Sequence, residues 1–151
     1  MLKEPTRHGI LYDVDARLRP DGAKGPLAVS DARLRDYYAG EADPWERLAL
    51  MKVRAVAGDE AFAARAERLA KEAAFSLPLN RETLDQVESL RVKLAQNAGP
   101  LDLKKGEGGI GEVEFIVRLW QLTHVDTAPG LMRGDVFGAM DLIEERELVP
   151  E

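Results

Sequence analysis

The chain has 151 residues, of which 45% are hydrophobic and 32% are charged, as is typical of a globular domain and not of a disordered chain. Its formal net charge of −6 excludes the global basic field of nonspecific nucleic-acid-binding proteins, and we expect no nucleic acid as a partner. Cysteine is absent, which excludes disulfides and thiolate chemistry and fits a cytoplasmic protein, and no apolar run approaches the roughly 20 residues of a membrane span.

Residues 11–20 alternate between polar and apolar side chains with period two, which predicts a β-strand. The apolar face would hold Tyr12, Val14, Ala16 and Leu18, and the charged face Asp13, Asp15, Arg17 and Arg19. Carboxylates hold Mg²⁺ and guanidinium groups bind phosphate oxygens, so the charged face is a candidate site for a metal-bound polyphosphate. A solvated edge strand whose charges pair with one another is the alternative. A turn at 20–22 and a short strand at 27–29 would complete an antiparallel hairpin.

The rest of the chain is predicted to be mainly helical. Helices are expected at 31–38, from 44 to Gly58, at 59–78, at 80–97, at 110–124 and at 135–147. We expect the third and fourth to pack face to face as a helical hairpin. The 110–124 helix is apolar around most of its circumference, which predicts a place in the middle of the core. The expected fold is thus mainly α, a small antiparallel β hairpin packed on a bundle of about five to six helices.

A second candidate site lies at the glycine segment 104–109, which leads into the 110–124 helix. Helix N-termini attract anions, and Lys104 and Lys105 would suit phosphates, although a tight approach between loop and sheet explains the glycines equally well. Glu114 lies among apolar residues, so its carboxylate needs a partner, and Arg118 is four residues further along the helix.

Four segments together resemble one family, the bacterial glutamine synthetase adenylyltransferase / adenylyl-removing enzymes. The segments are residues 11–22, residues 45–59, residues 102–104 and residues 108–117. They follow the order and spacing of the family, and the similarity covers nearly the whole chain. The Leu-Tyr-x-Val-Asp opening of the first segment and the Val-Ala-Gly-Asp ending of the second are more similar to the adenylylating than to the deadenylylating domain. The resemblance implies a polymerase-beta-type nucleotidyltransferase that uses ATP and Mg²⁺ to transfer AMP to a tyrosine of glutamine synthetase.

The resemblance also implies roles for particular residues. Asp15 matches the third metal carboxylate of the family, whereas Asp13 does not belong to the metal-binding pair. Arg17 and Arg19 match as phosphate-binding or ion-pair residues. The second block of the family is matched by Lys104, Glu112 and Glu114. Two departures stand out: no Gly-Ser…Asp-x-Asp motif occurs in the chain, and Arg118 replaces the usual glutamine.

We therefore expect the C-terminal portion of one nucleotidyltransferase domain, with residues 1–30 as a partial sheet and residues 31–151 as the helical bundle, together in one compact unit. Because the metal motif is missing, these residues are expected to be inactive on their own, and any binding of Mg²⁺ and ATP to be weak or absent. The alternative is a noncatalytic helical module that docks on glutamine synthetase or on a PII-type regulator. Self-association through the apolar strand face is a further expectation.

Overall fold

The computed structural model describes Arg7, Gly9 and residues 15–149, and the regular structure of residues 15–149 is helical. The six α-helices are α1 (Asp31–Gly40), α2 (Pro44–Leu50), α3 (Glu60–Phe75), α4 (Arg81–Gln96), α5 (Ile110–His124) and α6 (Val136–Glu145), and two 3₁₀ turns lie at Gly22–Lys24 and Pro129–Leu131. The mainly helical part of the predicted fold is confirmed. No helix in the described ranges is long and apolar enough to cross a membrane.

The predicted antiparallel hairpin is wrong, because residues 15–149 contain no β-strand. The expected returning strand at 27–29 has no regular structure, and Leu27 is 80% exposed. The Asp15 carboxylate accepts a hydrogen bond from the backbone N–H of Arg17 at 3.0 Å, a local turn that competes with an extended strand. Residues 11–14, the first part of the expected strand, lie outside the described residues.

Polar N-cap side chains determine where four of the helices begin. Ser30, Asp59, Asn80 and Asp135 each accept a hydrogen bond from the backbone N–H three residues further on. At α2 the Glu46 carboxylate accepts from the backbone N–H of Asp43 at 2.9 Å. One end differs from the prediction, since α2 stops at Leu50 and not near Gly58.

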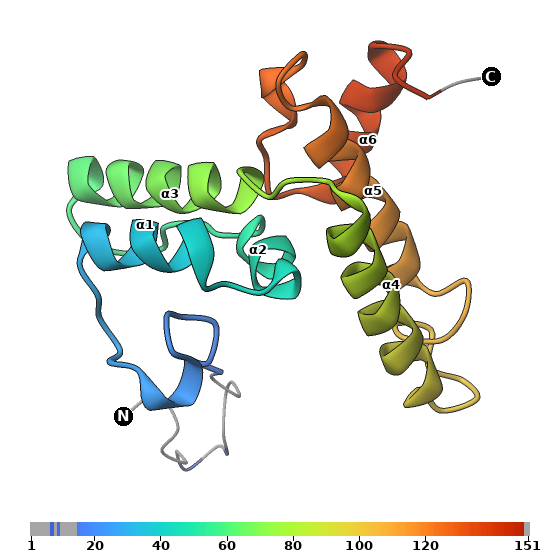
Figure 1. Cartoon of the computed structure of the whole chain (residues 1–151), viewed down its shortest axis with the longest axis horizontal. Coiled ribbons are helices and arrows are strands. Elements are labelled where there is room, and N and C mark those ends of the chain that lie inside the picture. Colours follow the sequence, from blue (N-terminus) through green and yellow to red (C-terminus); the bar gives the residue numbers. More distant parts are fainter. Residues whose placement is uncertain (1–6, 8, 10–14, 150–151) are drawn as a thin grey trace.

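The helices form two groups that meet at α5 (Figure 1). In the first, α3 packs across α1 and α2, while α4 packs against α2 and not against α3, so the expected helical hairpin is not formed. Tyr38, Met51 and Ala74 are at the centre of this core, which α5 joins through Leu122 and Val125. The second core lies between α5 and α6 and contains Val117, Leu131, Ala139 and Ile143.

Helix α5 contributes side chains to both cores, but its N-terminal half is partly exposed, which corrects the sequence-based expectation for that half. Ile110 and Ile116 are 70% and 61% exposed, whereas Arg118 and Gln121 are fully buried. The two polar side chains are buried because each donates hydrogen bonds to backbone carbonyl groups of the loop before α6. The carbonyl groups that these side chains bind are not paired within a helix, and buried carbonyl groups need hydrogen-bond donors.

Candidate functional site

Helices α2, α4 and α5 and the loop at 100–109 surround a cavity of about 360 Å³. Its walls are mainly apolar and are formed by Trp45, Leu48, Leu90, Leu94 and Phe115. Three of the six predicted site residues, Lys104, Glu112 and Glu114, line this cavity. Each comes from the segment 104–114, so the second block of the sequence forms one side of the site.

The loop before α5 is tightly folded and fixes the backbone at Lys104. The Asp102 carboxylate accepts from the backbone N–H groups of Lys104 and Lys105, at 3.0 Å each, which lowers the pKa of Asp102. The Lys104 carbonyl in turn accepts from the N–H of Gly111 at 2.9 Å. A Cβ atom on Gly111 would lie 2.6 Å from that carbonyl oxygen, so this close approach requires glycine. The backbone is therefore held on both sides of Lys104.

Glu112 ties this loop to α4. One carboxylate oxygen accepts from the backbone N–H of Gly108 at 2.8 Å, and the other pairs with Arg91 of α4. The Gly108 N–H, together with the Arg91 guanidinium, holds the pKa of Glu112 below its ordinary value. Glu112 is thus a partnered, ionised carboxylate that orders the loop beside the cavity.

Glu114 has the partner that the sequence predicted and a second one from another helix. Its carboxylate lies 3.6 Å from the Arg118 guanidinium and forms a salt bridge with Lys52, just after α2. The acidic side chains that line the cavity are thus paired with other residues, and the nearest negative charge to Lys104 and Lys105 is the Asp102 carboxylate of their own loop. Neither lysine forms a salt bridge within the described part of the chain.

Arg118 lies beneath this pair, with only 1% of the residue exposed. Its guanidinium donates to the Gly134 carbonyl at 2.6 Å, to the Arg133 carbonyl at 3.2 Å and to the Gln121 side chain at 2.8 Å. Burial lowers the pKa of Arg118, an effect that the charge of Glu114 opposes. The Nε atom is buried and has no hydrogen-bond partner among the described residues, although Arg118 also lines the cavity.

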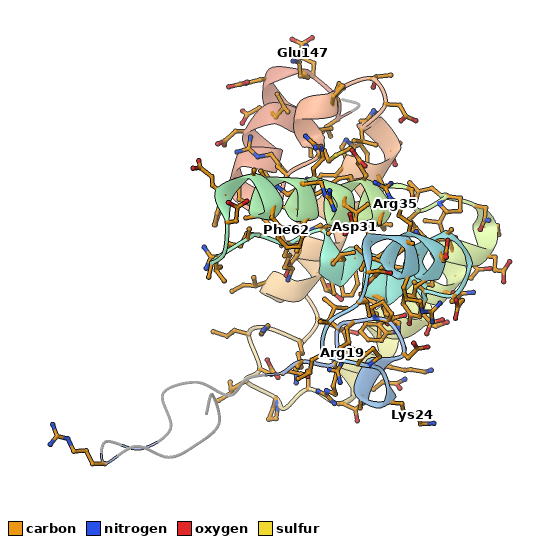
Figure 2. All side chains as sticks on the ribbon, turned by 90° about the vertical axis from the view of Figure 1, so that its left-hand side faces the viewer. Arg19, Lys24, Asp31, Arg35, Phe62 and Glu147 are labelled. Carbon is orange, nitrogen blue, oxygen red and sulfur yellow. The ribbon has the colours of Figure 1, made fainter. Side chains whose placement is uncertain are left out.

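The other three predicted residues, Asp15, Arg17 and Arg19, belong to the segment 15–30. The Asp15 and Arg17 side chains form a bidentate pair with distances of 2.6 and 2.8 Å, and Arg19 donates to the Gly25 carbonyl at 3.2 Å. This segment and the loop at 100–109 lie apart, on two sides of the molecule (Figure 1). Figure 2 shows Arg19 and Lys24 of this segment near one end of the molecule and Glu147 at the opposite end. The structure therefore does not bring the two halves of the predicted site together.

Sequence reasoning missed three residues of the cavity: Trp45, Lys52 and Arg91. Trp45 is 44% exposed and Arg91 supports Glu112 from α4. Trp45 lies in one of the segments that carry the family resemblance, which was a usable signal. Lys52 and Arg91 have no local pattern that marks them, because their partners lie 62 and 21 residues away in the sequence.

Known proteins give an independent view of the chain. The family model for glutamate-ammonia ligase adenylyltransferase matches residues 1–69. A bifunctional glutamine synthetase adenylyltransferase/adenylyl-removing enzyme of Rhodopseudomonas palustris (strain HaA2) is 36% identical over 139 residues. That alignment covers 90% of this chain but only 14% of the relative. The chain therefore belongs to the family of glutamine synthetase adenylyltransferase/adenylyl-removing enzymes.

Proposed function

We propose that this chain is part of a cytoplasmic enzyme that transfers AMP from ATP to a tyrosine hydroxyl of glutamine synthetase. The name of the relative supplies the reaction class and the protein acted on. The observation that carries the proposal is the convergence of Lys104, Glu112 and Glu114 on one cavity. These three residues are the ones that the family resemblance selects in the C-terminal part of the chain.

Lys104 and Lys105 are the groups that would meet the phosphates of ATP. Two adjacent ammonium groups favour a polyanion, and their backbone N–H groups are already used by Asp102, so the side chains would make the contacts. Glu112 and Glu114 would serve the nucleotide indirectly, by holding the loop and Lys52 in place. A direct contact of either carboxylate with phosphate is disfavoured by repulsion between like charges.

A complete Mg²⁺ site cannot be built from the described residues. They contain no group of three histidine or acidic side chains that could hold a metal ion, and the Asp15 carboxylate is engaged by Arg17. We propose Asp15 as one metal ligand, with Arg17 and Arg19 near the phosphates; because this segment lies apart from Lys104, these roles require the two segments to approach each other.

In the proposed transfer, the tyrosine hydroxyl loses its proton to solvent and its oxygen forms a bond to the α-phosphorus of ATP, while the bond between the α-phosphorus and the α,β-bridging oxygen breaks and pyrophosphate leaves. Positive side chains assist by offsetting charge on the phosphate oxygens. Of the carboxylates that the family uses for metal, the sequence supplies one, so we propose that the 151 residues alone do not transfer AMP.

A second function is favoured by the surface of α5. Ile110, Val113 and Ile116 are exposed along one side of its N-terminal half, as in a helix that meets another protein. We propose as the alternative a noncatalytic module that docks on glutamine synthetase or a PII-type regulator. The predicted self-association through the apolar strand face has less support, because Ala16 and Leu18 are not part of a strand.

Calorimetric titration with ATP separates the two functions. A charged hydrogen bond contributes about 1.5–3 kcal/mol, so Lys104→Ala should weaken ATP binding by about tenfold or more. Lys24→Ala, on the segment 15–30, is the matched control and should have no effect. Mg²⁺-dependent strengthening that disappears in Asp15→Asn would support the metal role of Asp15. If the chain binds glutamine synthetase but shows no heat of binding with ATP, the docking module is favoured instead.

A further inference from the structure

We infer that the cavity between α2, α4 and α5 binds a small ligand with an apolar body, the size of one or two rings, that carries an anionic group. The inference concerns the cavity itself and does not depend on AMP transfer. It follows from three properties of the described residues: the size and lining of the cavity, the charge at its mouth, and a buried guanidinium in its wall.

The size and lining suit a small molecule. A volume of about 360 Å³ falls within the range of ligand pockets, roughly 300–1,000 Å³. Leu48, Leu90 and Phe115 form walls on three different helices, and Trp45 presents a half-exposed ring beside them. An apolar guest would remove this surface from water, which is the main source of affinity in such pockets.

The mouth of the cavity is positive, although the chain as a whole has a net charge of −6. Lys104 and Lys105 line it and form no salt bridge with any described residue, while Glu112 and Glu114 are held by Arg91 and by Lys52. A neutral or cationic guest would gain nothing from the two ammonium groups. An anionic group at the mouth would pair with them.

Arg118 supplies the third property. Its side chain is 2% exposed, it lines the cavity, and its Nε donor has no partner among the described residues. The Nε atom has almost no accessible surface, so a ligand in the cavity does not reach it in this conformation. Arg118 instead supplies positive charge to the wall of the cavity, which favours an anionic guest.

Two kinds of ligand share this chemistry, a nucleotide and a separate aromatic or branched carboxylate. The fluorescent probe 1-anilinonaphthalene-8-sulfonate has the required apolar rings and a single anionic group. We expect it to bind the chain at one saturable site. Displacement of the probe by ATP would assign the cavity to the nucleotide. Displacement by 4-phenylbutyrate but not by ATP would assign it to a separate carboxylate.

Variants locate the probe. Ala49→Phe places a phenyl ring inside the cavity and should weaken binding of the probe by about tenfold or more, as should Leu94→Trp at its edge. Lys104→Gln with Lys105→Gln should weaken the sulfonate by about tenfold but leave neutral N-phenyl-1-naphthylamine unchanged. The matched control is Lys24→Gln with Lys93→Gln, two exposed lysines that do not line the cavity.

Several outcomes would overturn the inference. Multiple weak probe sites, or a site that survives both Ala49→Phe and Leu94→Trp in variants with unchanged helical circular dichroism, would show that the cavity is not the binding site. Equal sensitivity of the sulfonate and the neutral amine to the lysine pair would show that the mouth does not select an anion.

Discussion

Replacing Arg118 by methionine tests whether a buried arginine holds α5 against the loop before α6. Methionine keeps much of the length and apolar character of the side chain but removes every donor. In the native protein the guanidinium donates to Gln121, Arg133 and Gly134. The substitution therefore removes the hydrogen bonds while disturbing the packing as little as possible.

The expected loss follows from counting the groups left without a partner. The Arg133 carbonyl keeps the hydrogen bond from Gln121 at 3.0 Å, so only the Gly134 carbonyl and the Gln121 side-chain oxygen become unsatisfied. Each costs about 1–3 kcal/mol, or about 2–6 kcal/mol together. Removing the unpaired Nε donor returns part of this, which leaves a destabilisation of about 3 kcal/mol.

Urea unfolding monitored by circular dichroism measures this difference as a change in the free energy of unfolding. Arg68→Met is the matched control, because Arg68 is exposed on α3, and its effect should stay within about 0.5 kcal/mol. A loss below about 1 kcal/mol for Arg118→Met would refute the assignment of a structural role to the buried arginine.

Two further predictions concern the loop at 102–111. Gly111→Ala should destabilise the protein by about 1–3 kcal/mol in the same assay, because the added Cβ would meet the Lys104 carbonyl. Gly40→Ala is the control and should be neutral, because Gly40 has open space around it. Equal effects of the two substitutions would contradict the close approach at Gly111. The lowered pKa of Glu112 means that its contribution is complete above the ordinary value of 4.5 and is lost as the pH falls through the lower folded pKa. The amide proton of Gly108 should therefore titrate in NMR spectra with a midpoint below 4.5, and Glu112→Gln should abolish the transition; a midpoint at or above 4.5 would exclude the proposed anchor.

Helix positions could be predicted from the sequence because their signals are local. Asn80 and Asp135 cap their own helices, and Gly and Pro residues separate the segments. The prediction of a hairpin was wrong because period-two alternation is only a local preference. The Asp15 and Arg17 side chains form a salt bridge with each other, which needs no neighbouring strand. The position of α5 was predicted incompletely, because the number of apolar residues in the helix does not reveal the loop carbonyl groups. Arg118 and Gln121 are buried because they donate hydrogen bonds to these carbonyl groups.

The candidate site was predictable in part for the same reason. Glu114 and Arg118 are four residues apart on one helix, so their pairing follows from helix geometry. The salt bridges of Lys52 with Glu114 and of Arg91 with Glu112 depend on how three helices meet, and no pattern in the sequence specifies that arrangement.

We propose that the segment 102–112, which joins the loop to the first turn of α5, forms the nucleotide-binding side of an adenylyltransferase. Hydrogen–deuterium exchange with and without saturating ATP tests it most directly, because it reports on every segment of the chain at once. We predict slower exchange at 102–112 in the presence of ATP, and no such change in Lys104→Ala. Slower exchange confined to residues 15–30, or no change anywhere, would contradict the claim.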